Sequence, residues 1–222
     1  MAIFSVNKMI IRTVLSLLCF FICCNTFAQK HWNINGGINF TYPTTSFLLN
    51  YKMGIGEQLG VTYTADLINN ISIISGLEID HHTWKFNDLY YFTKDLDVEM
   101  LDHEFIEWNL SVPLLCDYEI EFTKLGLHFI TGPQLFYGLD NRLKVFQYKG
   151  TDDISNLDMY TNSYSGIKYK RFNTAWNIGT GISVKDFTFY FKASLGLTNI
   201  AKETSYKVHK NNYSISIGYY FK

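Results

Sequence analysis

The alternation of apolar residues with small or polar ones constrains this chain more than any other feature. In the closing stretch "NYSISIGYYFK", every second residue from Tyr213 to Phe221 is Tyr, Ile or Phe, while Ser214, Ser216 and Gly218 lie between them. A period of two places successive side chains on opposite faces of a strand. This stretch therefore predicts a strand with one apolar and one polar face.

Seven further segments show the same period, so the sequence predicts eight strands. These segments begin at Trp32, Met53, Ile71, Trp108, Leu125, Phe172 and Phe187. The chain holds 18 Phe, 16 Tyr and 4 Trp but only 3 Pro, a composition that favours strands.

The connections between these segments alternate in length. Three are tight: "INN" after Leu67, "EFTK" around Phe122, and "KD" at 185–186. The other four span about 12, 20, 30 and 12 residues, a pattern of short turns at one end and long loops at the other that is typical of outer-membrane barrels. If the "EFTK" turn sets the register, Asp117 and His128 face one another, since both are equally distant from it.

The two faces of the predicted strands differ in size as well as polarity. Most glycines share the polar parity with Ser and Asn, and these small residues suit the narrow interior of an eight-stranded barrel. A soluble lipocalin-type barrel would turn the apolar face inward, but the Trp, Phe, Tyr and Leu face is too bulky for that lumen. Because it is also too apolar for water, lipid is the remaining solvent. The expected fold is all-β: an eight-stranded antiparallel up-and-down transmembrane β-barrel.

The N-terminus reads as a secretory signal peptide, residues 1–28. Lys8 and Arg12 precede an apolar run over Thr13–Cys24, and Ala28 ends a small-residue cleavage site. The run is too short to cross a bilayer, which takes roughly 20 residues. The barrel domain is then 29–222. Its formal charge of −1 − 2 = −3 does not suit nucleic acid, and Cys116 is its single cysteine, so it has no intramolecular disulfide.

Several segments resemble a known family. "FIEWNLSVPLLCDYEI" with "LGLHFITGPQLFY", and "FYFKASLGLTNI" with "YSISIGYYF", are similar to paired strands of the PorT-like outer-membrane β-barrel family. The resemblance implies an outer-membrane protein, partners in a secretion or assembly complex, and no family catalytic residues to carry over. From the barrel itself we expect both termini in the periplasm and no cofactor. The expected partners also include outer-membrane lipid and the barrel assembly machinery. Pro113 and Pro133 match family positions within strands, where a bulge would accommodate a missing N–H.

Charged and imidazole side chains of the polar parity should line the lumen. They are Asp66, Glu78, Asp80, His82, Asp117, Glu119, His128, Arg171 and Lys192. They could form a proton site, a metal site or a polar channel, but a network of ion pairs filling a closed lumen is favoured, because buried charges are normally paired. The alternate positions of Glu78, Asp80 and His82 could also share a cation.

Two alternatives to a structural or interaction role remain. A lipid-modifying enzyme needs a hydroxyl nucleophile beside a histidine. The nearest pair, Ser75 and His81, is separated by about 20 Å along a strand, so we expect no enzyme. A surface binding protein would use aromatic side chains of its long loops, and these could equally pack on each other and on the rim. The candidates are Tyr90, Tyr91, Phe92, Tyr148, Tyr160 and Tyr164.

The end of the last segment has an expected role of its own. Tyr219 and Phe221 should lie in the aromatic girdle. By resemblance to outer-membrane proteins, they belong to the terminal signal that the assembly machinery reads, although Lys222 follows the aromatic residue.

Overall fold

The structure is a computed structural model that describes residues 30–45, 50–92, 98–149, 152–162, 164, 169–202 and 207–221. The predicted signal peptide lies outside these ranges. The strands are β1 (Lys30–Thr45), β2 (Asn50–Ile68), β3 (Ile71–Phe92), β4 (Val98–Phe122), β5 (Leu125–Lys149), β6 (Asp152–Asn162), β7 (Phe172–Val184), β8 (Phe187–Gly196) and β9 (Val208–Phe221). None of the described residues belongs to a helix long and apolar enough to span a membrane.

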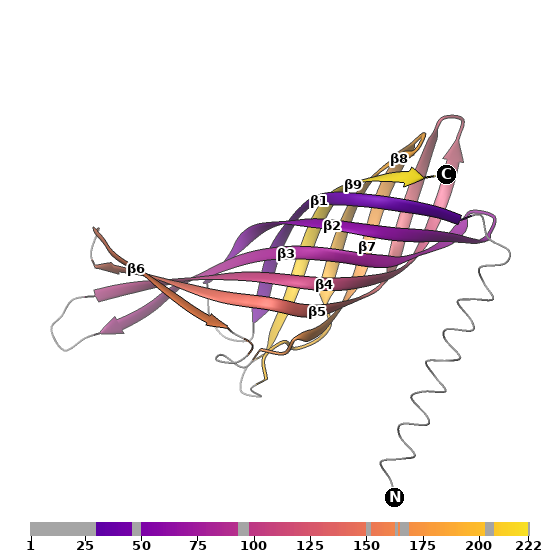
Figure 1. Ribbon diagram of the computed structural model, residues 1–222. Coiled ribbons are helices and arrows are strands. Elements are labelled where there is room, and N and C mark those ends of the chain that lie inside the picture. Colours follow the sequence, from indigo (N-terminus) through magenta and orange to yellow (C-terminus); the bar gives the residue numbers. More distant parts are fainter. Residues whose placement is uncertain are drawn as a thin grey trace, which may run out of the picture.

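Eight of these strands close into an antiparallel barrel (Figure 1). The ring runs β1-β2-β3-β4-β5-β7-β8-β9, and β9 pairs with β1 to complete it. Each strand of the ring pairs with the one before it in the chain, apart from β7, which pairs with β5. β6 pairs with β5 outside the ring. The predicted eight-stranded up-and-down barrel is therefore confirmed, with one additional strand.

The barrel is polar inside and apolar outside. On β9 the exposed fraction is 1% for Ser214 and 51% for its neighbour Ile215. On β8, Thr188 is fully buried while Phe189 is half exposed. Side chains of the apolar parity thus point away from the lumen, as expected for a face that contacts lipid.

Close strand packing explains why glycine falls on the inner face. A Cβ added to Gly76 would lie 2.2 Å from the carbonyl oxygen of Val61, and one added to Gly54 would lie 1.8 Å from that of Thr83. Both contacts are with the backbone of a neighbouring strand and could not be relieved by a rotamer change. A side chain at either position would push two strands apart.

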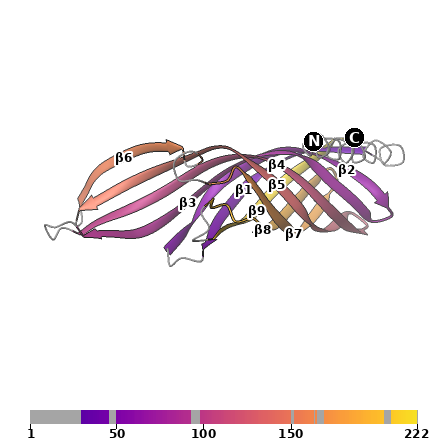
Figure 2. The ribbon, with the colours of Figure 1, turned by 90° about the horizontal axis from the view of Figure 1, so that it is seen from below.

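Two of the expected long loops are extensions of strands instead. β3 and β4 stay paired out to Phe92↔Val98, and β5 continues to Lys149 after its last pair with β7, Tyr137↔Phe172. With β6 they form a sheet that projects from one end of the barrel (Figures 1 and 2). We call this sheet, made of the outer parts of β3, β4 and β5 together with β6, the projecting sheet. The alternation with period two fades in these segments.

The tight turns and the two described chain ends share the opposite end of the barrel, where Trp32 pairs with Phe221. The β4–β5 turn is shorter than the predicted "EFTK", since Phe122 pairs with Leu125. The expected register was therefore wrong by two residues.

The prolines do not produce the expected bulges. The register of β4 and β5 is the same at Pro113↔Gln134 and at Cys116↔Thr131, and Pro133 pairs with Trp176 without a shift. The irregularity between β4 and β5 lies at Trp108/Asn109, near the start of the projecting sheet. The bulge predicted at the prolines is thus wrong.

Candidate functional site

The lumen is layered along the barrel axis. A polar cavity of about 610 Å³ opens at the tight-turn end, and we call it the cup. Deeper in the lumen, buried Ile74, Leu115 and Ile130 form an apolar layer. A polar network and then an aromatic cluster follow toward the projecting sheet. Each layer draws side chains from several strands, because alternate residues of every strand point inward.

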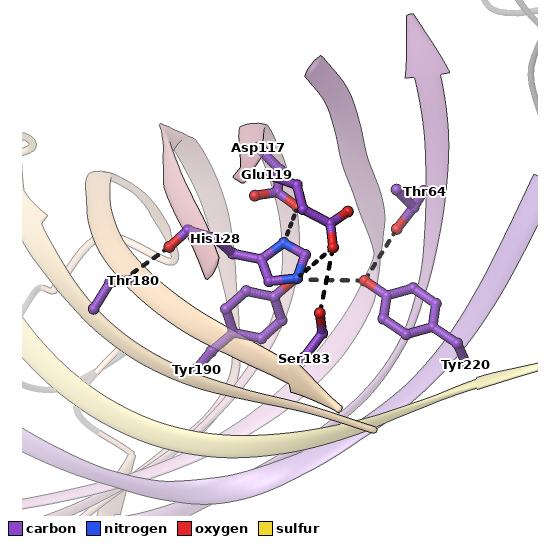
Figure 3. Close-up of polar contacts among 8 residues, drawn as sticks. All are labelled: Thr64, Asp117, Glu119, His128, Thr180, Ser183, Tyr190 and Tyr220. Atoms are coloured by element: carbon purple, nitrogen blue, oxygen red, sulfur yellow. Dashed lines mark hydrogen bonds and ion pairs between the residues drawn. The ribbon is translucent and has the colours of Figure 1, made fainter. Parts of the chain in front are cut away.

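A histidine held by two carboxylates lies in the wall of the cup (Figure 3). His128 Nδ1 is 2.9 Å from Asp117 Oδ2, and its Nε2 is 3.5 Å from Glu119 Oε1. Ser183 donates to the same Glu119 oxygen at 3.3 Å. Glu119 is the residue paired with His128 across the strands, and Asp117 is paired with Ile130. The expected contact between Asp117 and His128 is confirmed, but it runs diagonally.

Two tyrosines lie where the cup meets the apolar layer. The hydroxyls of Tyr190 and Tyr220 are 3.5 Å apart, and Thr64 is 3.5 Å from Tyr220 Oη. The Tyr190 ring meets the His128 ring edge-on at 5.7 Å and also packs against the apolar layer. The apolar layer and Tyr190 border a second cavity of about 40 Å³ on their other side, so they form the floor of the cup.

The middle network holds the acids that were candidates for a shared cation. Gln134 Nε2 donates to Glu78 Oε2 and to Ser111 Oγ, both at 2.9 Å, and Ser111 donates to Asp80. Lys192 Nζ is 3.7 Å from Glu78 Oε2.

His82 has a different partner, because its Nδ1 bonds Thr41 Oγ1 at 2.8 Å. Glu78 and Asp80 are thus linked through Gln134 and Ser111, whereas His82 is engaged elsewhere. The described ranges hold no group of three His, Cys, Asp or Glu side chains that could bind a metal ion.

A buried ion pair that sequence reasoning missed lies at the other end of the lumen. Lys210 Nζ contacts Glu107 Oε2, and Tyr164 donates to Glu107 Oε1 at 2.7 Å. Burial, and then the Glu107 carboxylate, raise the pKa of Tyr164, so its hydroxyl stays a donor. Glu107 precedes the first residue of the predicted strand, and Lys210 fell in a predicted loop. Both residues lie an even number of positions from the inward-facing residues of the same strand. Extending the predicted strands with that spacing is the only sequence signal that could have revealed them.

An aromatic cluster surrounds this ion pair. Trp84 and Phe105 stack with ring centroids 5.2 Å apart, and Lys210 Nζ lies 5.4 Å from the Trp84 ring centroid. Segments between strands cover the cluster with Tyr169 and Ile200. The base of the projecting sheet is therefore packed against the segments that carry Tyr169 and Ile200.

Two of the predicted lumen residues lie near its ends. Asp66 is half-buried and lines the cup. Arg171 precedes β7 and is exposed; its Nη1 donates to the carbonyls of Gly138 and Leu139 at 3.0 and 3.2 Å, and its guanidinium lies 4.7 Å from the centroid of the Tyr164 ring. Arg171 thus binds backbone carbonyls at the rim of the barrel and does not line the lumen as predicted.

Comparison with known proteins identifies the family. The profile of the family described as "Outer membrane protein beta-barrel domain" matches residues 27–202. The chain belongs to this family. No curated protein matches its sequence.

The solved structures that resemble this outer membrane barrel include three examples. The first is Ail, the attachment invasion locus protein of Yersinia pestis, in complex with the heparin analogue sucrose octasulfate, at 13% identity and a TM-score of 0.45 over 87% of this chain and 99% of that one. Neisserial surface protein A matches at 13% identity and a TM-score of 0.37, over 86% of this chain and 97% of that one. The outer membrane enzyme PagL matches at 10% identity and a TM-score of 0.37, over 82% of this chain and 98% of that one.

The aromatic candidates of this outer membrane barrel fall into two groups. Tyr164 is buried in the aromatic cluster, with 5% of its surface exposed. The side chains of Tyr90, Tyr91, Phe92, Tyr148 and Tyr160 lie outside the described residues, although their backbones belong to β3, β5 and β6.

The closing aromatic residues face outward from the barrel. The rings of Tyr219 and Phe221 are 5.0 Å apart, and Phe187 on β8 lies 5.1 Å from Tyr219. They form an aromatic patch at the tight-turn end, and their role in assembly stays a prediction.

The pair considered for an enzyme remains separated. Ser75 pairs with Leu114 and His81 with Trp108, six residues further along β4 (114 − 108 = 6). His81 Nδ1 is 3.2 Å from Glu57 Oε1 on the outer face, and its ring stacks on Trp108 at 4.6 Å.

Proposed function

We propose that this outer-membrane protein is a non-enzymatic structural or interaction component that presents the projecting sheet to a partner. One observation carries the proposal. β5 continues for 149 − 137 = 12 residues after its last pair with β7, which is about 40 Å of strand at 3.4 Å per residue. A barrel that needed only to cross the membrane would not require this extension.

The orientation follows from the two kinds of connection. Outer-membrane barrels place short turns in the periplasm and long connections outside the cell. By that rule the tight turns and both chain termini face the periplasm, and the projecting sheet faces the exterior. Residues 1–28 would act as the signal peptide that directs export before the barrel assembles.

The partner class comes from the resemblance to PorT-like proteins. Proteins of a secretion or assembly complex would bind the projecting sheet, and the barrel assembly machinery would recognise the closing strand with Tyr219 and Phe221. The ion pair between Glu107 on β4 and Lys210 on β9 holds the base of the projecting sheet against the barrel. This rigid attachment supports a docking role. A firmly held sheet loses little conformational freedom when it binds.

Cross-linking in intact cells tests the proposal with a matched truncation. Phe86 pairs with His103, so a two-residue Asn-Gly turn between them would remove the tip of the β3–β4 hairpin while preserving strand pairing. The full-length protein should capture a specific partner, and the truncated one should lose it while still showing heat-dependent gel mobility. Capture of the same partner by both would refute docking through the projecting sheet.

A lipid-modifying enzyme is the second candidate, and one observation favours it. His81 is held by Glu57 on the outer face, where a lipid could reach it. Mass spectrometry of lipid A from a deletion strain and from a His81→Ala strain decides between the two. Unchanged lipid A in both supports the non-enzymatic role, and the same change in both would establish the enzyme.

A further inference from the structure

The cup at the tight-turn end is strongly acidic. Its described lining includes the carboxylates of Asp66, Asp117, Glu119, Glu121 and Asp186. The cationic candidates facing them are His128 from β5 and Lys185 from the β7–β8 turn. The remaining lining side chains are neutral: Thr64, Asn69, Ser72, Ser183, Thr188 and Tyr220. A concave site lined by one sign of charge and walled by protein concentrates counter-ions of the opposite sign.

A buried carboxylate oxygen in this cup lacks a partner. Asp117 is 2% exposed, and its Oδ2 contacts His128. Its Oδ1 has no hydrogen-bond partner among the described residues, although Asp117 lines the cavity. Leaving a buried acceptor unsatisfied costs free energy. A ligand donor at this position would remove that cost.

The geometry points to an organic cation rather than a metal ion. The described residues hold no cluster of three carboxylate, imidazole or thiol groups suited to a metal. The cavity, at about 610 Å³, has the size of a small-molecule site. Tyr220 adds an aromatic ring to the lining, which suits a cation or an aliphatic stem.

We propose that the cup binds an ammonium or guanidinium group carried on an unbranched aliphatic chain. The charged group donates to Asp117 Oδ1 beside His128 (Figure 3), and the rim carboxylate of Glu121 attracts it into the cavity. The ligand enters from the compartment that holds the tight turns, since the apolar layer closes the other side. A free polyamine and a lysine or arginine side chain of a polypeptide carry the same chemistry.

Calorimetry on the full mature chain, refolded in detergent micelles, tests this inference. The probes are spermidine for a free polyamine, N-acetyl-lysine-amide for a polypeptide side chain, and Ca²⁺ for a metal ion. The variants are Asp117→Asn and Glu121→Gln. Asp140→Asn, at the opposite end of the barrel and bound to Arg142, is the matched control.

Saturable binding of either amine that weakens with salt supports the proposal, and the stronger probe identifies the source. Asp117→Asn should weaken binding by about thirtyfold or more, as expected when a buried charge partner is removed. Glu121→Gln, at the exposed rim, should weaken it by about two- to fivefold, and Asp140→Asn should leave it unchanged.

Loss of folding in Asp117→Asn would not block the test. Glu121→Gln and the ¹⁵N shifts of the His128 ring in the wild-type barrel report on the cup independently, and both should respond to the amine. The proposal is overturned if no amine binds at low ionic strength, if Ca²⁺ binds more tightly than both amines, or if Asp140→Asn weakens binding as much as Glu121→Gln.

Discussion

A lysine at Ile217 probes the membrane-facing surface at its middle. Ile217 lies on β9 between Gly36 on β1 and Phe189 on β8, with 43% of its surface exposed. It is four residues from Tyr213 and four from Phe221, which share its face. Four residues of a strand tilted about 40° rise about 10 Å along the barrel axis. Ile217 therefore lies near the centre of an apolar band about 25 Å tall.

The expected cost of Ile217→Lys follows from this depth. A lysine at the midplane destabilises an outer-membrane barrel by about 2–4 kcal/mol, and one near the interface by about 0–1 kcal/mol. Ile68 ends β2 beside the tight turn and is 70% exposed, so Ile68→Lys makes the same chemical change at the rim. Ser216 is unsuitable as a lumen control because it borders the cavity of about 40 Å³ beside Lys192, where overpacking would add its own cost.

Reversible urea titrations of folding into phospholipid vesicles, followed by tryptophan fluorescence, measure both variants. Ile217→Lys should lower the free energy of unfolding by about 1–4 kcal/mol more than Ile68→Lys does. Equal costs would show that Ile217 does not lie deeper in lipid than Ile68, and the placement of the band would be wrong.

Three further outcomes are expected. Glu107→Gln should cost about 3–5 kcal/mol in the same titration because it leaves the Lys210 ammonium buried without its carboxylate; Glu107→Gln combined with Lys210→Met should cost less than the sum of the single changes, and additive costs would contradict coupling. Unheated and boiled samples should migrate differently on a detergent gel, and identical mobility would contradict a closed barrel. Planar-bilayer recordings should show no large, stable conductance steps, because Ile74, Leu115 and Ile130 close the lumen; such steps would refute that closure.

The part of the fold inside the membrane was predictable because lipid imposes a simple rule on it. Most outward residues must be apolar, so Ile215 and Ile217 alternate with Ser214 and Ser216 without interruption. The projecting sheet obeys no such rule. In "EMLDHEF" neither parity is uniformly apolar, and β6 and the outer parts of β3–β5 were therefore predicted as loops.

The candidate site was predictable by face but not by contact. Parity correctly placed Asp117, His128 and Lys192 inside the lumen. Partner choice depends on register, and the two-residue error in the β4–β5 turn put Asp117 directly opposite His128 where Glu119 lies. The contact survived that error because the imidazole ring of His128 reaches its diagonal neighbour across the strands. Lys210 was missed because the alternation of side chains shows which face a residue occupies but does not show where the strand begins.

The seam between β1 and β9 has a consequence for how the chain folds. Its pairs run from Trp32↔Phe221 to Thr45↔Val208, so they join residues 221 − 32 = 189 to 208 − 45 = 163 positions apart. The other ring pairings join strands adjacent in the chain or separated by β6 alone. Contacts of such high sequence separation carry the largest loop-closure entropy and form slowly. Zipping of this seam should accordingly be the last and rate-limiting step, and until then β1 and β9 present two open edges on which a chaperone or a second unfinished barrel could add a strand.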